Sequence, residues 1–240
     1  MSQPETEEIP REDLVYLADV MKDQEVPEES IKYLRRAIAL NPRLTENEQL
    51  LFAFPYRKIV NRIRDSLSHV SDVYYNENSP TESQAAALSI LRESLINQLL
   101  NVSSEVCTIV NEVFLPNCES PADKCVYHLI IADFSRYIAE LDIEDSVPAC
   151  ETSLQNYQKA IEFATQALPA AHPTRLSACL NFAKLLHDVR DKKDHAIEIA
   201  QKAYNEGDAG LSEITDSTLI QSSKDILQML KDDTIRWSCQ

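Results

Sequence analysis

The chain has 240 residues, of which 44% are hydrophobic and 26% charged, as in a soluble globular protein with one sizeable domain or two small ones. Its formal net charge of −16 disfavours binding to nucleic acid, although one phosphate could still bind in a locally basic pocket. The only two glycines, Gly207 and Gly210, exclude the glycine-rich loops that cradle nucleotide phosphates, and they disfavour a strand-rich fold. Composition therefore favours an all-α protein.

Hydrophobic spacings of three and four residues, broken by proline and polar residues, predict about nine antiparallel helices with short connections. In chain order, the expected ranges are 12–24, 28–40, 45–73, 79–114, 120–141, 146–168, 172–186, 191–206 and 211–237. The third helix should begin with a capping box, Thr45 to Glu48, and should kink or loosen at Pro55. Gly207 to Gly210 should connect the last two helices. We expect residues 1–10 to be a disordered acidic tail and residues 11–240 to form a single helical domain.

The cysteine pattern and the N-terminus bear on the compartment. The six cysteines show neither a C-x-x-C pair nor a small disulfide framework, which indicates free thiols in a reducing compartment. The N-terminus is acidic and lacks the apolar run of a signal peptide, and no stretch approaches the roughly 20 apolar residues of a membrane span. We therefore expect a cytoplasmic protein that does not bind a membrane.

The stretch from Tyr127 to Glu140 is the most informative. Apolar residues at helical spacing predict one buried face, formed by Tyr127, Ile130, Ile131, Phe134, Ile138 and Leu141. Arg136 lies off that face, one turn from Asp133 and next to Tyr137. A guanidinium beside a phenol, held by a carboxylate, can bind a phosphate because arginine stays charged and offers a planar fork of donors. A surface Arg136–Asp133 ion pair is the alternative interpretation of these residues alone.

Two further arginines could contribute to the same site. Arg57 and Arg64 are seven residues apart on the third predicted helix, nearly two turns, so both side chains leave the same face. Together with Arg136 they could converge on one anion, and two or three arginines would neutralise a phosphoserine. Taken alone, Arg57 and Arg64 are better explained as part of a solvated helix face near acidic partners.

A set of motifs in a fixed order makes the chain resemble the 14-3-3 protein family over most of its length. These are Leu115-Pro116-Asn117, Asp133-x-x-Arg136-Tyr137-x-Ala139-Glu140, His172-Pro173-x-Arg175-Leu176, Leu180-Asn181-Phe182, Asp216-Ser217-Thr218-Leu219-Ile220 and Trp237. The resemblance implies an all-α, cup-shaped bundle whose concave groove binds an extended phosphoserine or phosphothreonine peptide of client proteins. The implied phosphate-binding residues are Arg57, where the family usually has lysine, Arg64, Arg136 and Tyr137.

The same resemblance assigns residues to the rest of the groove. Asn181 would hold the peptide main chain, although such a residue alone is more often a satisfied polar core residue. Asp233 stands where the family has a second main-chain asparagine, and it can accept but not donate. The apolar wall would be formed by Leu180, Met229 and Trp237, with Asp188 near the rim.

Other positions depart from the family pattern. Lys184 and Arg236 fall where the groove is usually apolar, so we expect more tolerance for acidic residues beside the phosphosite. About six extra residues lie near Gln221 to Ile226. The family dimerises through its first helix against the third and fourth, but here Val26-Pro27 replaces the usual charged and aromatic contacts. We therefore expect a homodimer with weakened contacts.

No catalytic or metal-binding constellation stands out. The five histidines lack metal-ligand spacing, and neither a G-x-S-x-G motif nor a Cys–His pair is evident. We expect no enzyme activity, cofactor or metal. The leading hypothesis is a phosphopeptide-binding adaptor. The alternative is a helical-repeat-like scaffold that binds unphosphorylated peptides through a drifted groove.

Overall fold

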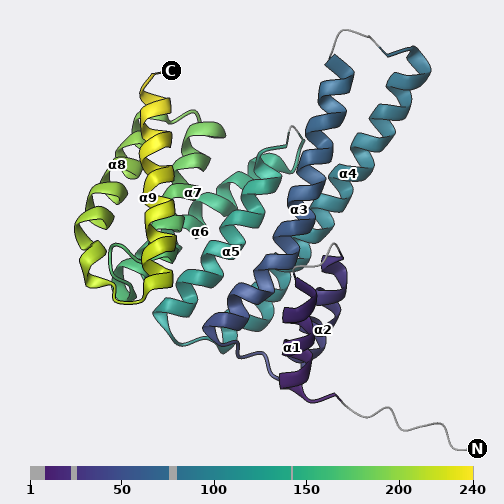
Figure 1. The fold of residues 1–240 in the computed structure, drawn as a ribbon. Coiled ribbons are helices and arrows are strands. Elements are labelled where there is room, and N and C mark those ends of the chain that lie inside the picture. The colour runs from purple at the N-terminus through teal and green to yellow at the C-terminus, as the bar shows by residue number, and fades with distance from the viewer. Residues whose placement is uncertain (1–8, 23–25, 76–79, 142, 240) are drawn as a thin grey trace, which may run out of the picture. The chain divides into compact units, whose positions relative to one another are not determined.

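The computed structural model describes residues 9–22, 26–75, 80–141 and 143–239, and within these ranges the chain is helical with no strand (Figure 1). Nine α-helices occur in this part of the chain, which confirms the all-α prediction. Of the tail expected at residues 1–10, residues 1–8 lie outside the described residues. Among the described helices, none has the length and apolar character needed to cross a membrane. The chain divides into two compact units, Met1–Val102 and Ser103–Gln240.

The first unit contains α1 (Arg11–Lys22), α2 (Pro27–Leu40), α3 (Glu46–Tyr75) and most of α4 (Glu82–Ile109). Its core includes the side chains of Leu14, Leu34, Phe52 and Tyr56, each at most 2% exposed. The predicted capping box is present, because Glu48 accepts from the Thr45 backbone N–H at 2.9 Å and donates its own N–H to the Thr45 hydroxyl at 3.4 Å. Helix α3 spans 30 residues and is not interrupted at Pro55.

The second unit begins at the end of α4. A single π-helical turn (Val110–Phe114) and a 3-10 turn (Leu115–Asn117) follow, and then α5 (Pro121–Ala139), α6 (Ser146–Ala167) and α7 (Pro173–Asp188). Helices α8 (Lys193–Gly210) and α9 (Ser217–Ser238) complete it, with a 3-10 turn (Leu211–Glu213) between them. Helix α5 packs along α6, and α7 packs against α6, α8 and α9.

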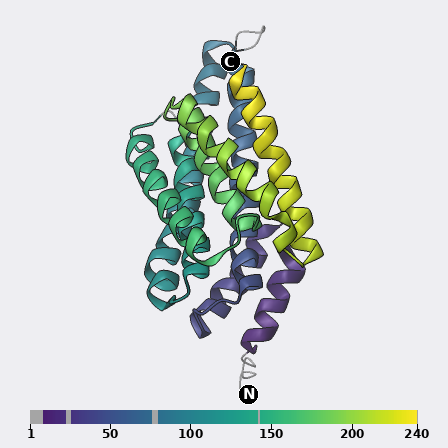
Figure 2. The ribbon, with the colours of Figure 1, turned by 90° about the vertical axis from the view of Figure 1, so that its left-hand side faces the viewer.

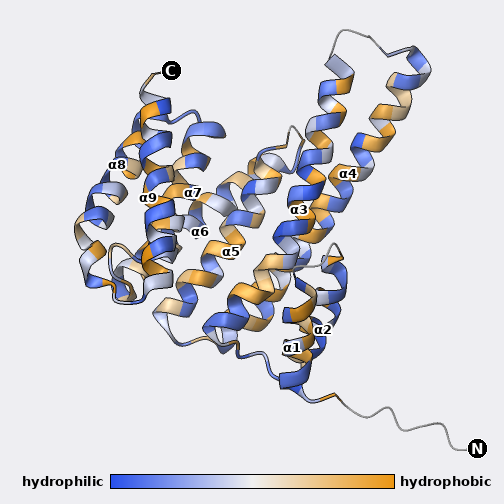
Figure 3. Cartoon of the chain, viewed as in Figure 1, coloured by the Kyte–Doolittle hydropathy of each residue, from blue (hydrophilic) through white to orange (hydrophobic). Residues whose placement is uncertain are grey.

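Both views show α9 running beside α8 (Figures 1 and 2). Hydrophilic and hydrophobic residues alternate along α9, as expected of a helix with one face against its neighbours (Figure 3). The additional residues Gln221 to Ile226 lie within this helix, between its start at Ser217 and the buried Leu227.

The predicted connector at Gly207 to Gly210 is wrong, because these residues form the last turn of α8. A Cβ atom at Gly207 would lie 2.7 Å from Leu176 Cδ2 and 3.0 Å from Leu227 Cδ2. Glycine at this position therefore permits close packing of α8 against α7 and α9, and it does not form a turn.

Candidate functional site

Helix α5 holds the central candidate residues in a buried setting. It begins at Ser120, whose hydroxyl accepts from the Asp123 N–H at 3.4 Å, and Pro121 occupies the favoured first position. Eleven of its residues are buried, so the helix is enclosed on more than the one face that the sequence pattern predicted. Arg136 lies near its C-terminal end, one residue before the buried Tyr137.

Arg136 is held by three neighbours. Its Nε donates to the Tyr157 hydroxyl at 3.1 Å, its Nη1 pairs with Glu140 one turn later, and its guanidinium lies 5.1 Å from the centre of the Tyr137 ring. The side chain is only 12% exposed, which excludes the alternative of a surface ion pair. Burial opposes the charge, but the Tyr157 oxygen and the carboxylates of Glu140 and Asp133 outweigh it and raise the pKa of Arg136. Arg136 is therefore a fixed cation.

Asp133 has a different role from the one expected. The sequence suggested that it pairs directly with Arg136, whereas its Oδ1 accepts from the Tyr157 hydroxyl at 2.7 Å and from Asn181 Nδ2 at 2.9 Å. Burial, followed by the neighbouring Asp133 carboxylate, raises the pKa of Tyr157 well above its usual value, so the phenol keeps its proton and donates it. The ion-pair partner of Arg136 is Glu140.

These contacts form one polar network across three helices, α5, α6 and α7. It runs from Glu140 through Arg136 and Tyr157 to Asp133 and ends at Asn181. The sequence pattern did not single out Tyr157, and it gave Glu140 no role beyond its place in the family motif. A tyrosine on the buried face of a helix is the signal that could have found it, because a buried phenol needs a hydrogen-bond partner.

Of the three groove residues predicted on α7, Asn181 belongs to this network, whereas Leu180 and Asp188 do not. Asn181 is half-buried and uses one N–H on Asp133. Leu180 is 4% exposed and belongs to the core of the unit, whereas Asp188 is exposed and accepts from His187 Nδ1 at 2.7 Å when that nitrogen is protonated.

Helix α9 carries a second polar cluster beside α7. Asp233 Oδ1 accepts from Arg236 Nη2 at 2.6 Å, and its Oδ2 lies 3.6 Å from Lys184 Nζ. The indole of Trp237 stacks on His187 with ring centres 4.6 Å apart. Trp237 Nε1 is buried and makes no hydrogen bond to the described residues, and the same holds for Asp233 Oδ2. Met229 is half exposed on the same helix.

Arg57 and Arg64 lie on α3 of the first unit. Both are half-buried, and each already interacts with another group. Their spacing on a continuous helix places them on one face, as predicted. That they meet Arg136 at one phosphate remains a prediction. In the described ranges, no group of three or more histidine, cysteine or acidic side chains is arranged to hold a metal ion.

Comparison with known proteins now identifies the family. The sequence profile described as 14-3-3 protein matches residues 17–238. The chain is 27% identical to the 14-3-3-like protein GF14 iota of Arabidopsis thaliana over 230 residues, 95% of this chain and 85% of that one. It is equally 27% identical to Protein BMH2 of Saccharomyces cerevisiae over 231 residues (95% and 84%) and to checkpoint signal transducer rad24 of Schizosaccharomyces pombe over 230 residues (95% and 85%). The chain therefore belongs to the 14-3-3 family, whose members are adaptors that bind partner proteins.

Proposed function

We propose that this protein binds an extended peptide carrying phosphoserine or phosphothreonine, and that it regulates client proteins by holding that segment. The observation that carries the proposal is the buried network around Arg136. A guanidinium at 12% exposure, fixed by Tyr157 and Glu140, is a preorganised partner for an anion. The two contacts occupy two of the five N–H donors of the guanidinium, which leaves donors for a ligand.

The phosphate would be bound by Arg57, Arg64, Arg136 and the Tyr137 hydroxyl. A phosphoserine carries about −1.5 to −2 charges at neutral pH, so three arginines more than neutralise it. Arg57 in place of the family's lysine adds a second planar fork, which suits bidentate contact with phosphate oxygens. Recognition of a phosphorylated motif by an arginine cluster is a known mode of peptide binding.

The rest of the peptide would lie along α7 and α9. Asn181 can bond a peptide amide with the remaining groups of its side chain. Lys184 and Arg236 share the single carboxylate of Asp233, so these three side chains together carry one net positive charge. This charge supports the expected tolerance for acidic residues beside the phosphosite.

Titration of a matched peptide pair tests the proposal. Isothermal calorimetry would compare a phosphoserine peptide with the same peptide unphosphorylated, and we expect at least a hundredfold tighter binding of the first. Arg64→Gln or Arg136→Gln should weaken phosphopeptide binding by about 2–3 kcal/mol, since each removes a charge-assisted contact. Arg92→Gln, at an exposed arginine of α4, is the control and should bind normally.

The alternative scaffold makes the opposite prediction. If the groove has drifted to unphosphorylated peptides, both peptides bind equally and neither arginine variant changes the affinity. Catalysis forms no part of either function. The six unpaired cysteines support a cytoplasmic location, where thiols stay reduced.

A homodimer is the expected assembly, with weaker contacts than usual in the family. In the first unit, a groove of about 530 Å³ between α1 and α3 is flanked by Tyr16, Leu50 and Phe54, which are 66%, 61% and 39% exposed. Such exposed apolar residues support an interaction surface. Sedimentation at micromolar concentration should give twice the monomer mass of 27.2 kDa. The dimer should dissociate when the protein is diluted. A monomer at all concentrations would refute this part of the proposal.

A further inference from the structure

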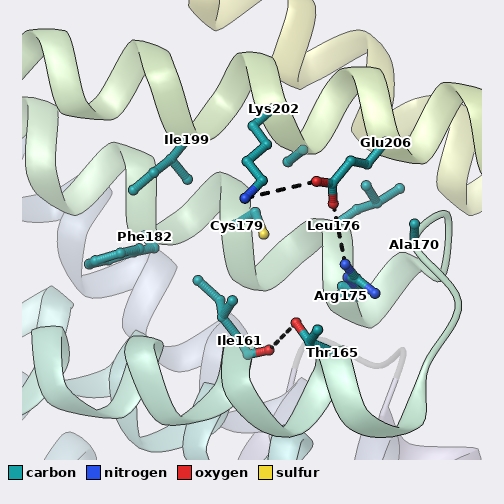
Figure 4. Close-up of a pocket in the computed structure, with 11 residues that line it drawn as sticks. Ile161, Thr165, Ala170, Arg175, Leu176, Cys179, Phe182, Ile199, Lys202 and Glu206 are labelled. Atoms are coloured by element: carbon teal, nitrogen blue, oxygen red, sulfur yellow. Dashed lines mark hydrogen bonds and ion pairs between the residues drawn. The ribbon is translucent and has the colours of Figure 1, made fainter.

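The second unit contains a pocket that the peptide site does not use. It lies between α6, α7 and α8, and its volume of about 340 Å³ is within the range of small-molecule sites (Figure 4). On α7, Arg175 lines this pocket, whereas Lys184 faces Asp233 on α9. These two residues are nine positions apart, about two and a half turns, and so lie on opposite sides of α7. A ligand here would leave the α7–α9 wall free.

One end of the pocket is apolar. Phe182 of α7, which is 6% exposed, lies at this end with Ile199 of α8 and Ile161 of α6, whereas the buried Leu176 lies beside Arg175 and Glu206 (Figure 4). Cys179 lies between the two ends, with its sulfur near the middle of the view (Figure 4). Burial raises the pKa of the Cys179 thiol to about 11, so it stays protonated and neutral at physiological pH. This part of the pocket therefore suits an uncharged hydrocarbon body.

The other end carries two cations and one carboxylate. Glu206 Oε2 lies 3.3 Å from Arg175 Nη2, and its Oε1 lies 3.9 Å from Lys202 Nζ. Arg175 is anchored further, since its Nη1 donates to the Leu168 carbonyl at 3.2 Å. The charged lining residues thus sum to one positive charge in a chain of net charge −16. The 3.9 Å contact is too long for a strong hydrogen bond, so Lys202 can take a second anionic partner.

We propose that this pocket binds a small monocarboxylic acid with an apolar body, its carboxylate between Lys202 and Arg175 and its hydrocarbon against Phe182, Ile199 and Ile161. A ligand anion supplies the charge that one glutamate leaves unbalanced. An ammonium head group would instead meet two like charges, and a neutral head group would leave the cations with Glu206 alone. The site is independent of the proposed phosphopeptide function.

Octanoate is the probe that tests the assignment. Titration of the full chain with octanoate, octanol and octylammonium by calorimetry and two-dimensional NMR keeps the hydrocarbon constant while the head group changes. We expect octanoate to bind most tightly, with shifts confined to α6, α7 and α8. Equal affinity for octanoate and octanol, or no octanoate binding, would overturn the proposal.

Two variants and one chemical readout sharpen the test. Lys202→Met removes the cation but keeps most of the apolar stem at a side chain that is 74% exposed, and should weaken octanoate binding about tenfold. Lys231→Met, at an exposed lysine of α9, should bind octanoate normally. Bound octanoate should also slow alkylation of Cys179 at pH 9 without affecting the exposed Cys239. Identical affinities for the two lysine variants, or unprotected Cys179, would contradict the assignment.

Discussion

Tyr157→Phe tests whether the buried network stabilises the protein. Tyr157 is fully buried and its hydroxyl both donates to Asp133 at 2.7 Å and accepts from Arg136 at 3.1 Å. Phenylalanine keeps the ring and its packing, so the substitution removes the two hydrogen bonds and little else.

The magnitude follows from what each partner keeps. A hydrogen bond to a charged group contributes about 1.5–3 kcal/mol, and two are lost. Asp133 keeps the Asn181 amide and Arg136 keeps Glu140, so the loss should be smaller than the sum of two such bonds. We expect destabilisation by about 3 kcal/mol, which corresponds to a melting temperature lower by about 6–12 °C for a chain of this size.

Differential scanning calorimetry of the wild type and two variants measures this effect. Tyr204→Phe is the matched control, because Tyr204 is a half-buried tyrosine of α8 in the same unit and lies outside the network. It should melt within about 1–2 °C of the wild type, as expected for a substitution worth at most about 0.5 kcal/mol. If Tyr157→Phe melted together with Tyr204→Phe, the network would not contribute to stability and the reasoning would fail.

Further substitutions follow from the packing and from one half-buried histidine. Gly207→Ala should destabilise the protein by about 1–3 kcal/mol, because the added methyl group would lie 2.7 Å from the buried Leu176 side chain. At Gly210 the added methyl group would meet no atom closer than 3.6 Å, so Gly210→Ala should be neutral or stabilising by up to about 1 kcal/mol. Urea unfolding measures both free-energy changes. Burial lowers the pKa of His128, so its contribution to stability is complete above pH of about 6.5 and is lost as the pH falls towards the lowered value. His128→Gln should therefore lose less stability than the wild type when the pH falls from 7.5 to 5.5. The control His69→Gln, at an exposed position, should show the pH dependence of the wild type. If the stability of His128→Gln depended on pH as that of the wild type does, the pKa shift would be contradicted.

Local features of the sequence predicted the helices well. The capping box from Thr45 to Glu48 and the Ser120-Pro121 start of α5 appear as expected, because each depends on residues three or four positions apart. The predicted connector at Gly207 to Gly210 was wrong because contacts between helices, and not local spacing, determine the role of Gly207. Glycine usually ends a helix, but here contact with two leucines of other helices decides its role, and such contacts are not visible in a local pattern.

The polar network shows the same division between local and distant signals. Arg136 and Asn181 could be singled out by type and by family resemblance, but the pairing of Asp133 with Tyr157 spans 24 positions and its pairing with Asn181 spans 48. Spacing within one helix suggested the nearest carboxylate, Asp133, as the partner of Arg136. The fold instead supplies a hydroxyl from α6 between them, and Glu140 takes the ion pair.

The second pKa of the phosphate in a bound phosphopeptide tests the arginine pocket most directly. Phosphorus NMR during a pH titration reports this pKa, which is about 6 for free phosphoserine. Contact with several guanidinium groups favours the dianion, so the account predicts a clear decrease of this pKa on binding, and a smaller decrease with Arg136→Gln. A bound phosphate that titrates like the free peptide would contradict the account.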